Sequence, residues 1–197
     1  SHKLRSKALK AIDETNFYPS KGKERLKSMI ETRPDWCVSR QRVWGVPLPI
    51  FINKENKKTN EILVDSEVFE NIAKIYEKEG SDCWFSDDPQ KFLGKKYKAE
   101  DFEKLSDIVE VWFDSGSTHS FVLEKRKDLK WPASMYLEGS DQHRGWFHSS
   151  LLESCGTRGR APFDSILSHG FVVDGKGLKM SKSLGNVIAP EDILKKY

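Results

Sequence analysis

The sequence contains no long hydrophobic run. None of its apolar stretches approaches the roughly 18 residues that a transmembrane helix needs, so a membrane span is excluded. The first residues, Ser1 to Arg5, are charged and lack the apolar stretch of a secretory signal peptide. We therefore expect a soluble protein with neither a membrane span nor a secretory signal.

Cysteine is scarce. Cys37, Cys83 and Cys155 stand far apart, are odd in number and form no C-x-x-C pair. This pattern supports neither a disulfide framework nor a zinc site, so we expect buried or incidental thiols and no metal-binding residues in the chain. A reducing cytoplasm fits such a composition, and a cytoplasmic location is the prediction.

An excess of charge of one sign is also missing. Lys and Arg number 33 against 30 Asp and Glu, and the resulting net charge of +3 does not by itself indicate a nucleic-acid-binding protein. Hydrophobic residues make up 37% and charged residues 32%, which is typical of a globular protein with a well-charged surface. The 197 residues can hold one sizeable core, or a core with a small appended module.

The first half of the chain divides into three segments. Residues 1–32 carry two short helical patterns around a turn-like stretch, and we interpret them as a connecting arm. Residues 33–51 combine arginines and tryptophans with an apolar end that is typical of a strand. Residues 52–105 are polar and contain a helical pattern for which Ser66 is a plausible N-cap. We predict that 52–105 is an inserted small α+β module.

From residue 106 onward, strand-like and helical patterns alternate, which favours an α/β fold with a parallel sheet. The predicted strands cover 108–113, 135–137 and 165–173, and a predicted helix covers 142–155. Each strand runs into polar or glycine-rich sequence. Because ligands bind at the carboxyl ends of the strands in such sheets, we expect the site residues to converge at one edge.

The most informative segment is the loop from Asp174 to Ser183. Its glycines give the backbone freedom, and Lys179 and Lys182 can reach phosphate oxygens. A flexible basic hairpin is the alternative for a generic loop of this composition. The string Lys-Met-Ser-Lys-Ser at 179–183 favours phosphate binding, because it is the signature of class I aminoacyl-tRNA synthetases. Nothing else in the sequence obviously ties the loop down, so we expect it to be mobile without ATP.

The second candidate segment, 138–147, lies at a predicted strand end and opens a helix. Glu138, Asp141 and Gln142 are suited to hydrogen-bonding ribose hydroxyls or an ammonium group. Gly139 would let a ligand approach the backbone closely. The alternative is an ordinary helix N-terminus with acidic caps.

Two tryptophans and a histidine complete the candidate set. Trp112 and Trp146 would line a rigid apolar pocket near the strand ends, although each taken singly also suits a hydrophobic core. His169 interrupts the last predicted strand just before its end. A histidine in a strand is usually structural, but one beside a nucleotide-binding loop would touch the base or the ribose.

The motifs occur together, in one order, in a known family. They are Arg-Pro-Asp-Trp-Cys-Val-Ser-Arg-Gln-Arg (33–42), Val-Trp-Phe-Asp-Ser-Gly-Ser (111–117), Tyr-Leu-Glu-Gly-Ser-Asp-Gln-His-Arg-Gly-Trp-Phe (136–147) and the lysine string. The chain resembles isoleucyl-tRNA synthetases along nearly its whole length, and Glu-Gly-Ser-Asp-Gln-His-Arg favours them over their valine and leucine relatives. The resemblance implies a partial Rossmann-type parallel sheet, in 33–51 and 106–197, that condenses isoleucine with ATP and passes the acyl group to tRNA(Ile).

The resemblance also implies a role for each candidate residue. The residues implied to hold the aminoacyl-adenylate are Glu138, Gly139, Asp141 and Gln142, with His169 on its nucleoside part. The residues implied to border the isoleucine side chain are Trp112 and Trp146. Lys179 and Lys182 are implied to neutralise the triphosphate as the α-phosphorus is attacked, with Lys182 the stronger candidate. Mg²⁺ is expected to travel with ATP.

The chain departs from the family in what it leaves out. The His-x-Gly-His string of the early catalytic domain is absent, since the only His-Gly is His169-Gly170. Most of the editing insertion, the anticodon-binding region and the zinc tail of many bacterial members are missing too. Residues 1–32 match the exit from the editing insertion, and 52–105 match the second connective insertion. A helix that begins well at Pro190 stops within eight residues, so we expect a truncated chain with negligible activation of isoleucine alone.

Two other interpretations stay open. A class I synthetase of the valine or methionine type shares the lysine loop but fits 138–147 poorly. A stand-alone nucleotide- or RNA-binding module derived from a synthetase is the second, and the near-neutral charge argues against strong RNA binding. The missing N-terminal half of the catalytic domain is the expected partner, and the sheet edge that it leaves open makes self-association plausible.

Overall fold

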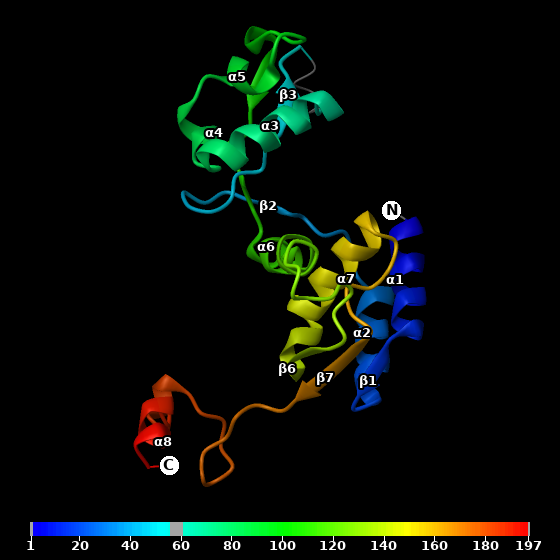
Figure 1. Ribbon diagram of the computed structural model, residues 1–197, viewed down its shortest axis with the longest axis vertical. Helices are drawn as coiled ribbons and strands as arrows, with labels where there is room; N and C mark the ends of the chain where they lie inside the picture. Colours follow the sequence, from blue (N-terminus) through cyan, green and yellow to red (C-terminus); the bar gives the residue numbers. More distant parts are fainter. Residues whose placement is uncertain (1, 56–60, 197) are drawn as a thin grey trace. The chain divides into compact units, whose positions relative to one another are not determined.

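Two compact units make up the computed structural model, which describes residues 2–55 and 61–196 (Figure 1). Unit 1 combines the chain up to Pro34 with the chain from Ser115 onward, and unit 2 comprises Asp35–Asp114. Within the described ranges, no helix is both long and apolar enough to cross a bilayer.

Unit 1 is built on a three-stranded parallel sheet, which confirms the predicted α/β fold. The strand order is β1–β7–β6, with β1 at Asn16–Tyr18, β7 at Ser165–His169 and β6 at Tyr136–Gly139. Phe17, Ile166 and Tyr136 lie side by side in this register, and all three are buried. In the next row, Tyr18 and Leu137 are 55% and 57% exposed. One face of the sheet therefore carries the core.

Three helices supply the rest of the core of unit 1. They are α1 (His2–Glu14), α2 (Lys21–Glu31) and α7 (Trp146–Thr157). Ile12, Leu26, Phe147 and Leu151 of these helices are fully buried in one cluster with Ile166 of the sheet. Burying a side chain of this size contributes about 1.5–3 kcal/mol, so this cluster is the main source of stability for the sheet.

The N-terminal segment belongs to this core and is more than the predicted connecting arm. Helices α1 and α2 contact each other, and α2 also contacts β1. β1 in turn pairs with β7, through Phe17 and Ile166. Three residues of strand are too few to show the alternation that marks a strand in sequence. The interpretation of residues 1–32 therefore overlooked an edge strand of the sheet.

Two element boundaries in unit 1 differ from the predictions. β7 ends at His169, whereas the predicted strand continued to residue 173. The predicted helix from residue 142 begins as a 3-10 turn, η3 (Ser140–His143), and α7 starts only at Trp146. The polar turn thus stands between the strand and the helix, and it carries the residues of the candidate site.

The predicted strand 108–113 was largely wrong. Only Ile108–Val109 is a strand, β5, and it pairs antiparallel with β2 (Ser39–Arg40) in a separate two-stranded sheet. Val111–Gly116 forms the helix α6 instead. A short apolar run fits a buried strand or a helix equally well, so its composition could not decide. Of the three predicted strand ends, only those of β6 and β7 meet in one sheet.

Unit 2 has a hydrophobic core of its own. Its elements are β3 (Phe51–Asn53), α3 (Ser66–Glu79), α4 (Cys83–Ser86), α5 (Pro89–Leu93), η1 (Ala99–Asp101) and β4 (Phe102–Lys104), with β3 and β4 antiparallel. Trp84 is fully buried at the centre, 5.1 Å from the Phe51 ring and 5.0 Å from the Phe92 ring. Its indole N–H donates to the carbonyl of Leu105 at 2.7 Å. The predicted module 52–105 and unit 2 share this core but not their bounds.

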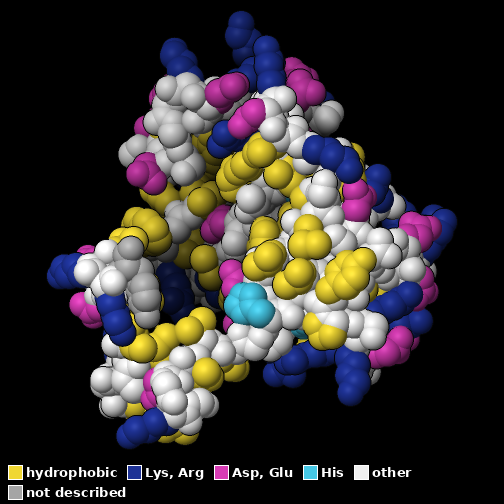
Figure 2. Space-filling model, turned by 60° about the horizontal axis from the view of Figure 1, so that its bottom comes forward, with side chains coloured by type: hydrophobic (Ala, Val, Ile, Leu, Met, Phe, Trp, Pro, Cys, Tyr) yellow, Lys and Arg dark blue, Asp and Glu magenta, His cyan; other side chains and the backbone are white. Residues whose placement is uncertain are grey.

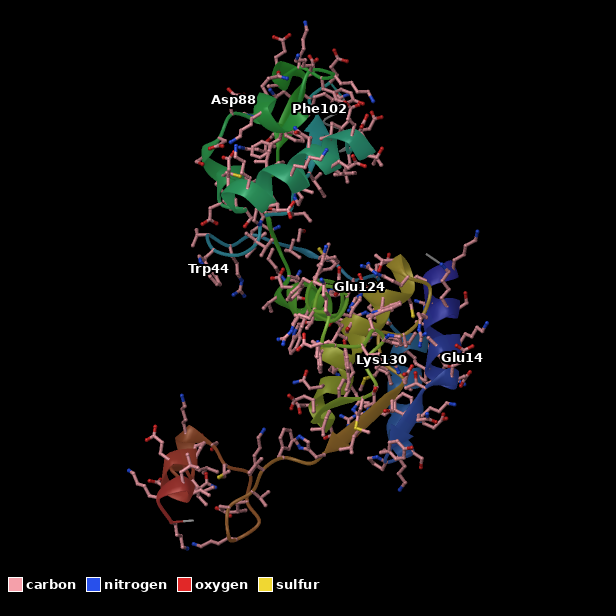
Figure 3. The ribbon with its side chains drawn as sticks, in the orientation of Figure 1. Glu14, Trp44, Asp88, Phe102, Glu124 and Lys130 are labelled. Carbon is pink, nitrogen blue, oxygen red and sulfur yellow. The ribbon has the colours of Figure 1, made fainter. Side chains whose placement is uncertain are left out.

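Aspartate side chains begin two of the helices of unit 2. Asp65, rather than the predicted Ser66, caps α3, and its Oδ1 accepts the N–H of Glu67 at 2.9 Å. Asp88 caps α5 and accepts the N–H of Gln90 at 2.7 Å (Figure 3). Such caps satisfy amides that a first helical turn leaves without an intrahelical partner.

The rest of unit 1 contains little regular structure. The π-helical turn η2 spans His119–Leu123, and the chain after β7 forms an isolated bridge between Val173 and Lys179, then η4 (Lys182–Leu184) and α8 (Pro190–Lys196). Apolar side chains are exposed along this last segment, including Phe171 at 52% and Leu184 at 67%. Hydrophobic side chains also reach the surface elsewhere, among charged ones (Figure 2).

One histidine in α7 is buried without hydrogen bonds to its ring nitrogens in the part of the chain that the structure describes. His148 is 3% exposed, and neither of its ring nitrogens has a hydrogen-bond partner among the described residues. Burial, and to a smaller extent the nearby Arg33, lowers the pKa of His148 to about 4. The folded protein therefore holds this imidazole neutral at a pH where the unfolded chain protonates it.

Replacing Trp84 tests the core of unit 2. We expect Trp84→Ala to lower the free energy of unfolding of unit 2 by about 3–5 kcal/mol, because it leaves a large cavity. The neighbouring Phe85 is 46% exposed, so Phe85→Ala is the matched control and should cost less than about 1 kcal/mol. Urea unfolding followed by amide exchange at Phe92 measures both. Equal costs for the two variants would contradict the assigned core.

The buried His148 predicts a loss of stability in acid. The unfolded chain binds a proton at this residue near pH 6.5, but the folded chain does so only near pH 4, so stability falls as the pH drops between these values. We expect a loss of up to about 3 kcal/mol, which His148→Phe should reduce. The measurement is urea unfolding at pH 7 and pH 4.5. His169→Gln, at an exposed histidine, is the control, and an unchanged pH dependence in His148→Phe would contradict the prediction.

Candidate functional site

The carboxyl ends of β6 and β7 bring four of the predicted site residues together. Glu138 and Gly139 end β6 and pair in register with Ser168 and His169 at the end of β7. A Cβ built at Gly139 would lie 3.9 Å from Cε1 of His169. Asp141 follows two residues later in η3, and its Oδ1 would lie 2.5 Å from the same Cβ position. The predicted convergence at one edge is therefore realised for these side chains.

Glycine at position 139 leaves room for the Asp141 carboxylate. A side chain there would collide with the Asp141 carboxylate, which lies well inside van der Waals contact of the built Cβ. The Glu138 carboxylate accepts the N–H of Gly139 through Oε1 at 2.8 Å. Glu138 and Asp141 are both exposed, so two accessible carboxylates flank the buried Gly139. Such a site suits hydroxyl or ammonium donors.

Gln142 connects the site to the helix that follows it. Its Oε1 accepts the N–H of Trp146, the first residue of α7, at 3.0 Å. Its Nε2 lies 3.2 Å from Oδ2 of Asp141 and donates to it. Both ends of the amide are thus occupied in the structure, so Gln142 orients Asp141 and the start of α7 as well as facing the site.

The two predicted tryptophans belong to different units. Trp146 is half-buried and stacks on Tyr136, with ring centroids 4.0 Å apart and an interplanar angle of 4°. Its indole N–H donates to the carbonyl of Ser115 at 2.9 Å, which fixes the ring as a rigid wall. Trp112 lies in α6 of unit 2 and is 41% exposed. Sequence reasoning missed Tyr136, whose place in a predicted strand gave no sign of the stacking.

The lysine loop is a hairpin organised by Asp174. Oδ1 of Asp174 accepts the N–H groups of Lys176 and Leu178, each at 2.9 Å. Gly177 has a φ of +76°, which favours glycine and lets the chain turn back. Val173 and Lys179 form the bridge that closes the hairpin.

Asn186 bridges the hairpin to the lysine string. Its Nδ2 donates to Oδ2 of Asp174 at 2.8 Å, and its Oδ1 accepts the N–H of Ser181 at 2.9 Å. The bond from Asn186, and then the backbone bond from Leu178, hold the pKa of Asp174 below its usual range. The expectation that nothing ties the loop down was therefore wrong for its internal structure. The mobility of the whole loop stays a prediction.

The two lysines of the string differ in their surroundings. The ammonium of Lys179 lies 3.7 Å from the ring centroid of Phe171, a cation–π contact. Lys182 begins η4, where the Ser181 hydroxyl caps the turn by accepting the N–H of Leu184 at 3.3 Å, and Lys182 is exposed. Both lysines are exposed, but Lys182 lies on a capped turn, whereas Lys179 lies over an aromatic ring.

Metal-binding clusters do not occur in residues 2–55 and 61–196, where no three His, Cys, Asp or Glu side chains are arranged to hold an ion. The three cysteines are free thiols: Cys37 is exposed, and Cys83 and Cys155 are buried.

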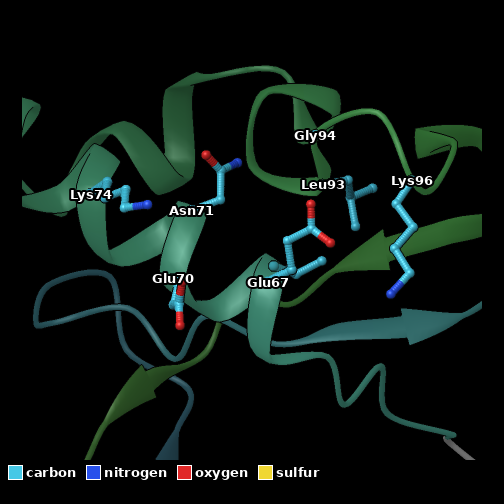
Figure 4. A pocket seen from close by; sticks show the side chains of 8 residues that line it. Glu67, Glu70, Asn71, Lys74, Leu93, Gly94 and Lys96 are labelled. Carbon is cyan, nitrogen blue, oxygen red and sulfur yellow. The ribbon is translucent and has the colours of Figure 1, made fainter.

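Unit 2 contains a separate pocket of about 230 Å³ (Figure 4). It is lined by Glu67, Val68, Glu70, Asn71, Lys74, Leu93, Gly94 and Lys96. Asn71 donates to the carbonyls of Lys91 and Phe92, and Lys96 pairs with Asp65. These two polar side chains thus hold α3 against α5 and the segment that follows it.

Replacing Asn186 tests the order of the lysine loop. Asn186→Ala removes one partner of Asp174 and the partner of the Ser181 amide, and we expect amide exchange at Ser181 to accelerate by about fivefold, since a net hydrogen bond is worth about 1 kcal/mol. Hydrogen exchange followed by NMR measures this rate. Val187→Ala, at a neighbour that is 51% exposed, is the control. Unchanged exchange at Ser181 would show that the bridge does not order the loop.

The whole chain matches one family of proteins. The family model of the class I tRNA synthetases (I, L, M and V) matches residues 1–197. The isoleucine–tRNA ligase of Pelagibacter ubique (strain HTCC1062) is 84% identical over 197 residues, which are 100% of this chain and 21% of that protein. That of Brucella abortus biovar 1 (strain 9-941) is 60% identical over 98% of this chain and 19% of its own length. The chain thus spans about a fifth of the curated relatives that it matches.

Solved structures share the fold at lower identity. The LeuRS of Agrobacterium radiobacter K84 agnB2, in a ternary complex with tRNA and LeuAMS, gives a TM-score of 0.57 at 22% identity, over 83% of this chain and 23% of that one. The methionyl-tRNA synthetase of Mycobacterium tuberculosis, bound by methionyl-adenylate, gives 0.55 at 17% identity, over 98% and 30%. These likenesses concern the fold alone, and they confirm the Rossmann-type architecture. With its whole length matched, the chain belongs to the class I tRNA synthetases of the isoleucine, leucine, methionine and valine group.

Proposed function

We propose that this chain is part of an isoleucyl-tRNA synthetase, the later half of the catalytic domain. The full enzyme activates isoleucine with ATP to isoleucyl-adenylate, releases pyrophosphate and transfers the acyl group to tRNA(Ile). The observation that carries the proposal is the 84% identity with the Pelagibacter ubique isoleucine–tRNA ligase over the whole chain. The chain covers 21% of that relative, so the complete reaction is proposed for the longer protein.

The ends of β6 and β7 are proposed to hold the aminoacyl-adenylate. The exposed carboxylates of Glu138 and Asp141 can accept hydrogen bonds from the ribose hydroxyls or the ammonium group of isoleucine. Gly139 leaves room for the Asp141 carboxylate at the strand end, and Gln142 sets the direction of Asp141. His169, opposite Gly139 in the register, is proposed to contact the nucleoside part.

The aromatic wall is proposed to recognise the isoleucine side chain. Trp146 is rigid because it stacks on Tyr136 and donates to Ser115, so a branched aliphatic group would meet a fixed surface. The same role for Trp112 rests on the family motif alone.

The lysine loop is proposed to bind the triphosphate of Mg²⁺-ATP. As the isoleucine carboxylate attacks the α-phosphorus and pyrophosphate leaves, negative charge shifts to the leaving phosphates, and an ammonium beside them stabilises that change. Lys182 is the stronger candidate because it lies on a capped turn, whereas Lys179 is held over the Phe171 ring. Lys179 would first give up or share its contact with Phe171.

The isolated chain is proposed to bind an adenylate without making one. Its sequence lacks the His-x-Gly-His string, and the N-terminal half of the catalytic domain is the proposed partner that supplies it. The exposed row with Tyr18 and Leu137 favours self-association of the isolated chain, because parallel sheets are normally covered on both faces. Residues 1–32 and 52–105 are proposed as the exit of the editing insertion and the second connective insertion. A cytoplasmic location completes the proposal.

Calorimetric titration with a non-hydrolysable isoleucyl-adenylate analogue tests the site. We expect saturable binding that Glu138→Ala weakens by about tenfold or more, because a hydrogen bond to a charged group is worth about 1.5–3 kcal/mol. Lys182→Ala should change this affinity by less than about threefold, because the analogue lacks the leaving phosphates that the lysine contacts. Glu77→Ala, at an exposed glutamate of α3, is the matched control.

The outcomes separate the parts of the proposal. Equal weakening by Glu138→Ala and Glu77→Ala, or no saturable binding, would remove the adenylate site from this chain. Tighter binding of the valyl than of the isoleucyl analogue would favour the valine type. Pyrophosphate exchange above background by the isolated chain would overturn the proposal that it cannot activate isoleucine alone. Salt-dependent retention on tRNA acceptor stems would revive an RNA-binding module.

A further inference from the structure

A buried histidine stands directly behind the candidate site. His143 is the last residue of η3 and is 1% exposed. Its Nδ1 lies 2.8 Å from the carbonyl oxygen of Ser140, the first residue of the same turn. A carbonyl oxygen only accepts, so Nδ1 carries the proton and donates. The bond closes the turn that contains Asp141 and Gln142.

The other edge of the ring faces helix α2. Nε2 of His143 is buried and has no hydrogen-bond partner among the residues that the structure describes. A Cβ built at Gly22 of α2 would lie 3.0 Å from Nε2, so the ring is seated against glycine backbone. Phe147 of α7 meets the ring edge to face, with centroids 5.4 Å apart at 89°. The neutral imidazole with its proton on Nδ1 fits this seat.

The surroundings also disfavour a charged ring. Burial, and then the charge of Arg25 on α2, lowers the pKa of His143, while the bond to Ser140 acts in the opposite direction. Phe147 of α7 brings no charge, and Asp141 on the same turn is exposed to solvent. His143 therefore remains a neutral donor near pH 7.

We infer that His143 is a positioning residue of the aminoacyl-adenylate site, which clamps the turn Ser140–His143 and so sets the Asp141 carboxylate beside Gly139. The inference rests on the proposed function for the identity of the ligand. Oδ1 of Asp141 lies 2.5 Å from where a Cβ on Gly139 would stand, so the carboxylate uses the space that the glycine leaves free. A turn that opened would move that carboxylate away from Gly139. Gly22 of α2 contributes to this positioning, because the absence of a side chain there leaves room for the His143 ring.

A second histidine provides a matched control. His119 is also 1% exposed, and its Nδ1 lies 3.0 Å from the carbonyl oxygen of Gly116, again three residues earlier. It lies in η2, outside the turn that carries Asp141. His119→Leu therefore removes the same kind of bond and the same ring without touching the proposed site.

The first experiment needs no ligand. Long-range ¹H–¹⁵N NMR spectra of this chain at pH 4 to 8 identify the protonated nitrogen of each histidine. We expect His143 to carry its proton on Nδ1 at pH 7 and to titrate below the ordinary range for histidine. In His143→Leu the amide signals of Gly139, Asp141 and Gln142 should shift, and in His143→Asn, which restores a donor near the Nδ1 position, they should return toward the wild type. A proton on Nε2, or unmoved amide signals in His143→Leu, would overturn the inference.

The second experiment separates positioning from simple stability. Both His143→Leu and His119→Leu should lower the urea midpoint, but only His143→Leu should weaken the isoleucyl-adenylate analogue, by about tenfold, with His143→Asn within about threefold of the wild type. Equal weakening by the two leucine variants would reduce His143 to a structural residue. If the wild-type chain does not bind the analogue, the proposed site fails, and the amide signals still decide whether His143 sets the turn. If His143→Leu does not fold, Gly22→Ala presses on the ring instead and should shift the same signals.

Discussion

The parallel pairing of β6 with β7 fixes the relative heights of Gly139 and His169, and the candidate site depends on that register. A ladder of backbone hydrogen bonds holds the two strand ends in place, because a slip by one residue would turn every side chain to the opposite face. Tyr136 and Ile166 are partners in this pairing, and both are buried in the core. Their burial fixes the register, because a slip would expose one of them. Glu138 and His169, at the carboxyl ends of the same strands, can stay exposed because Tyr136 and Ile166 already anchor these strands in the core.

Amide side chains join the pieces of unit 1 at two separate places. Gln142 accepts from the start of α7 and donates to Asp141, and Asn186 accepts from Ser181 and donates to Asp174. A carboxylate in either place could accept but not donate, and a lysine could donate but not accept. Each amide orients one carboxylate and one backbone N–H without adding a charge. Gln142 and Asn186 therefore each hold a neighbouring aspartate in place while remaining uncharged themselves.

The sequence predicted which candidate residues meet at the strand ends better than it predicted the elements around them. Glu138 and Asp141 lie together there, as expected, because both belong to one short local string. β1 was missed since it has three residues and pairs with a strand far along the chain. α6 was taken for a strand, as a short apolar run suits either. Asn186 was missed because it bonds Asp174 and Ser181, 12 and 5 residues earlier, across an irregular loop that no periodic pattern describes.

The two units differ in how their residues are distributed along the chain. Unit 2 is continuous, Asp35–Asp114, whereas unit 1 begins before it and resumes after it. During synthesis the core of unit 2 can therefore form as soon as its own residues have emerged from the ribosome. β1 must wait for β7, because Phe17 pairs with Ile166. Such long-range pairing is slow to form and leaves unpaired strand edges exposed meanwhile. Of the two units, unit 1, which carries the candidate site, is thus the later to complete its fold.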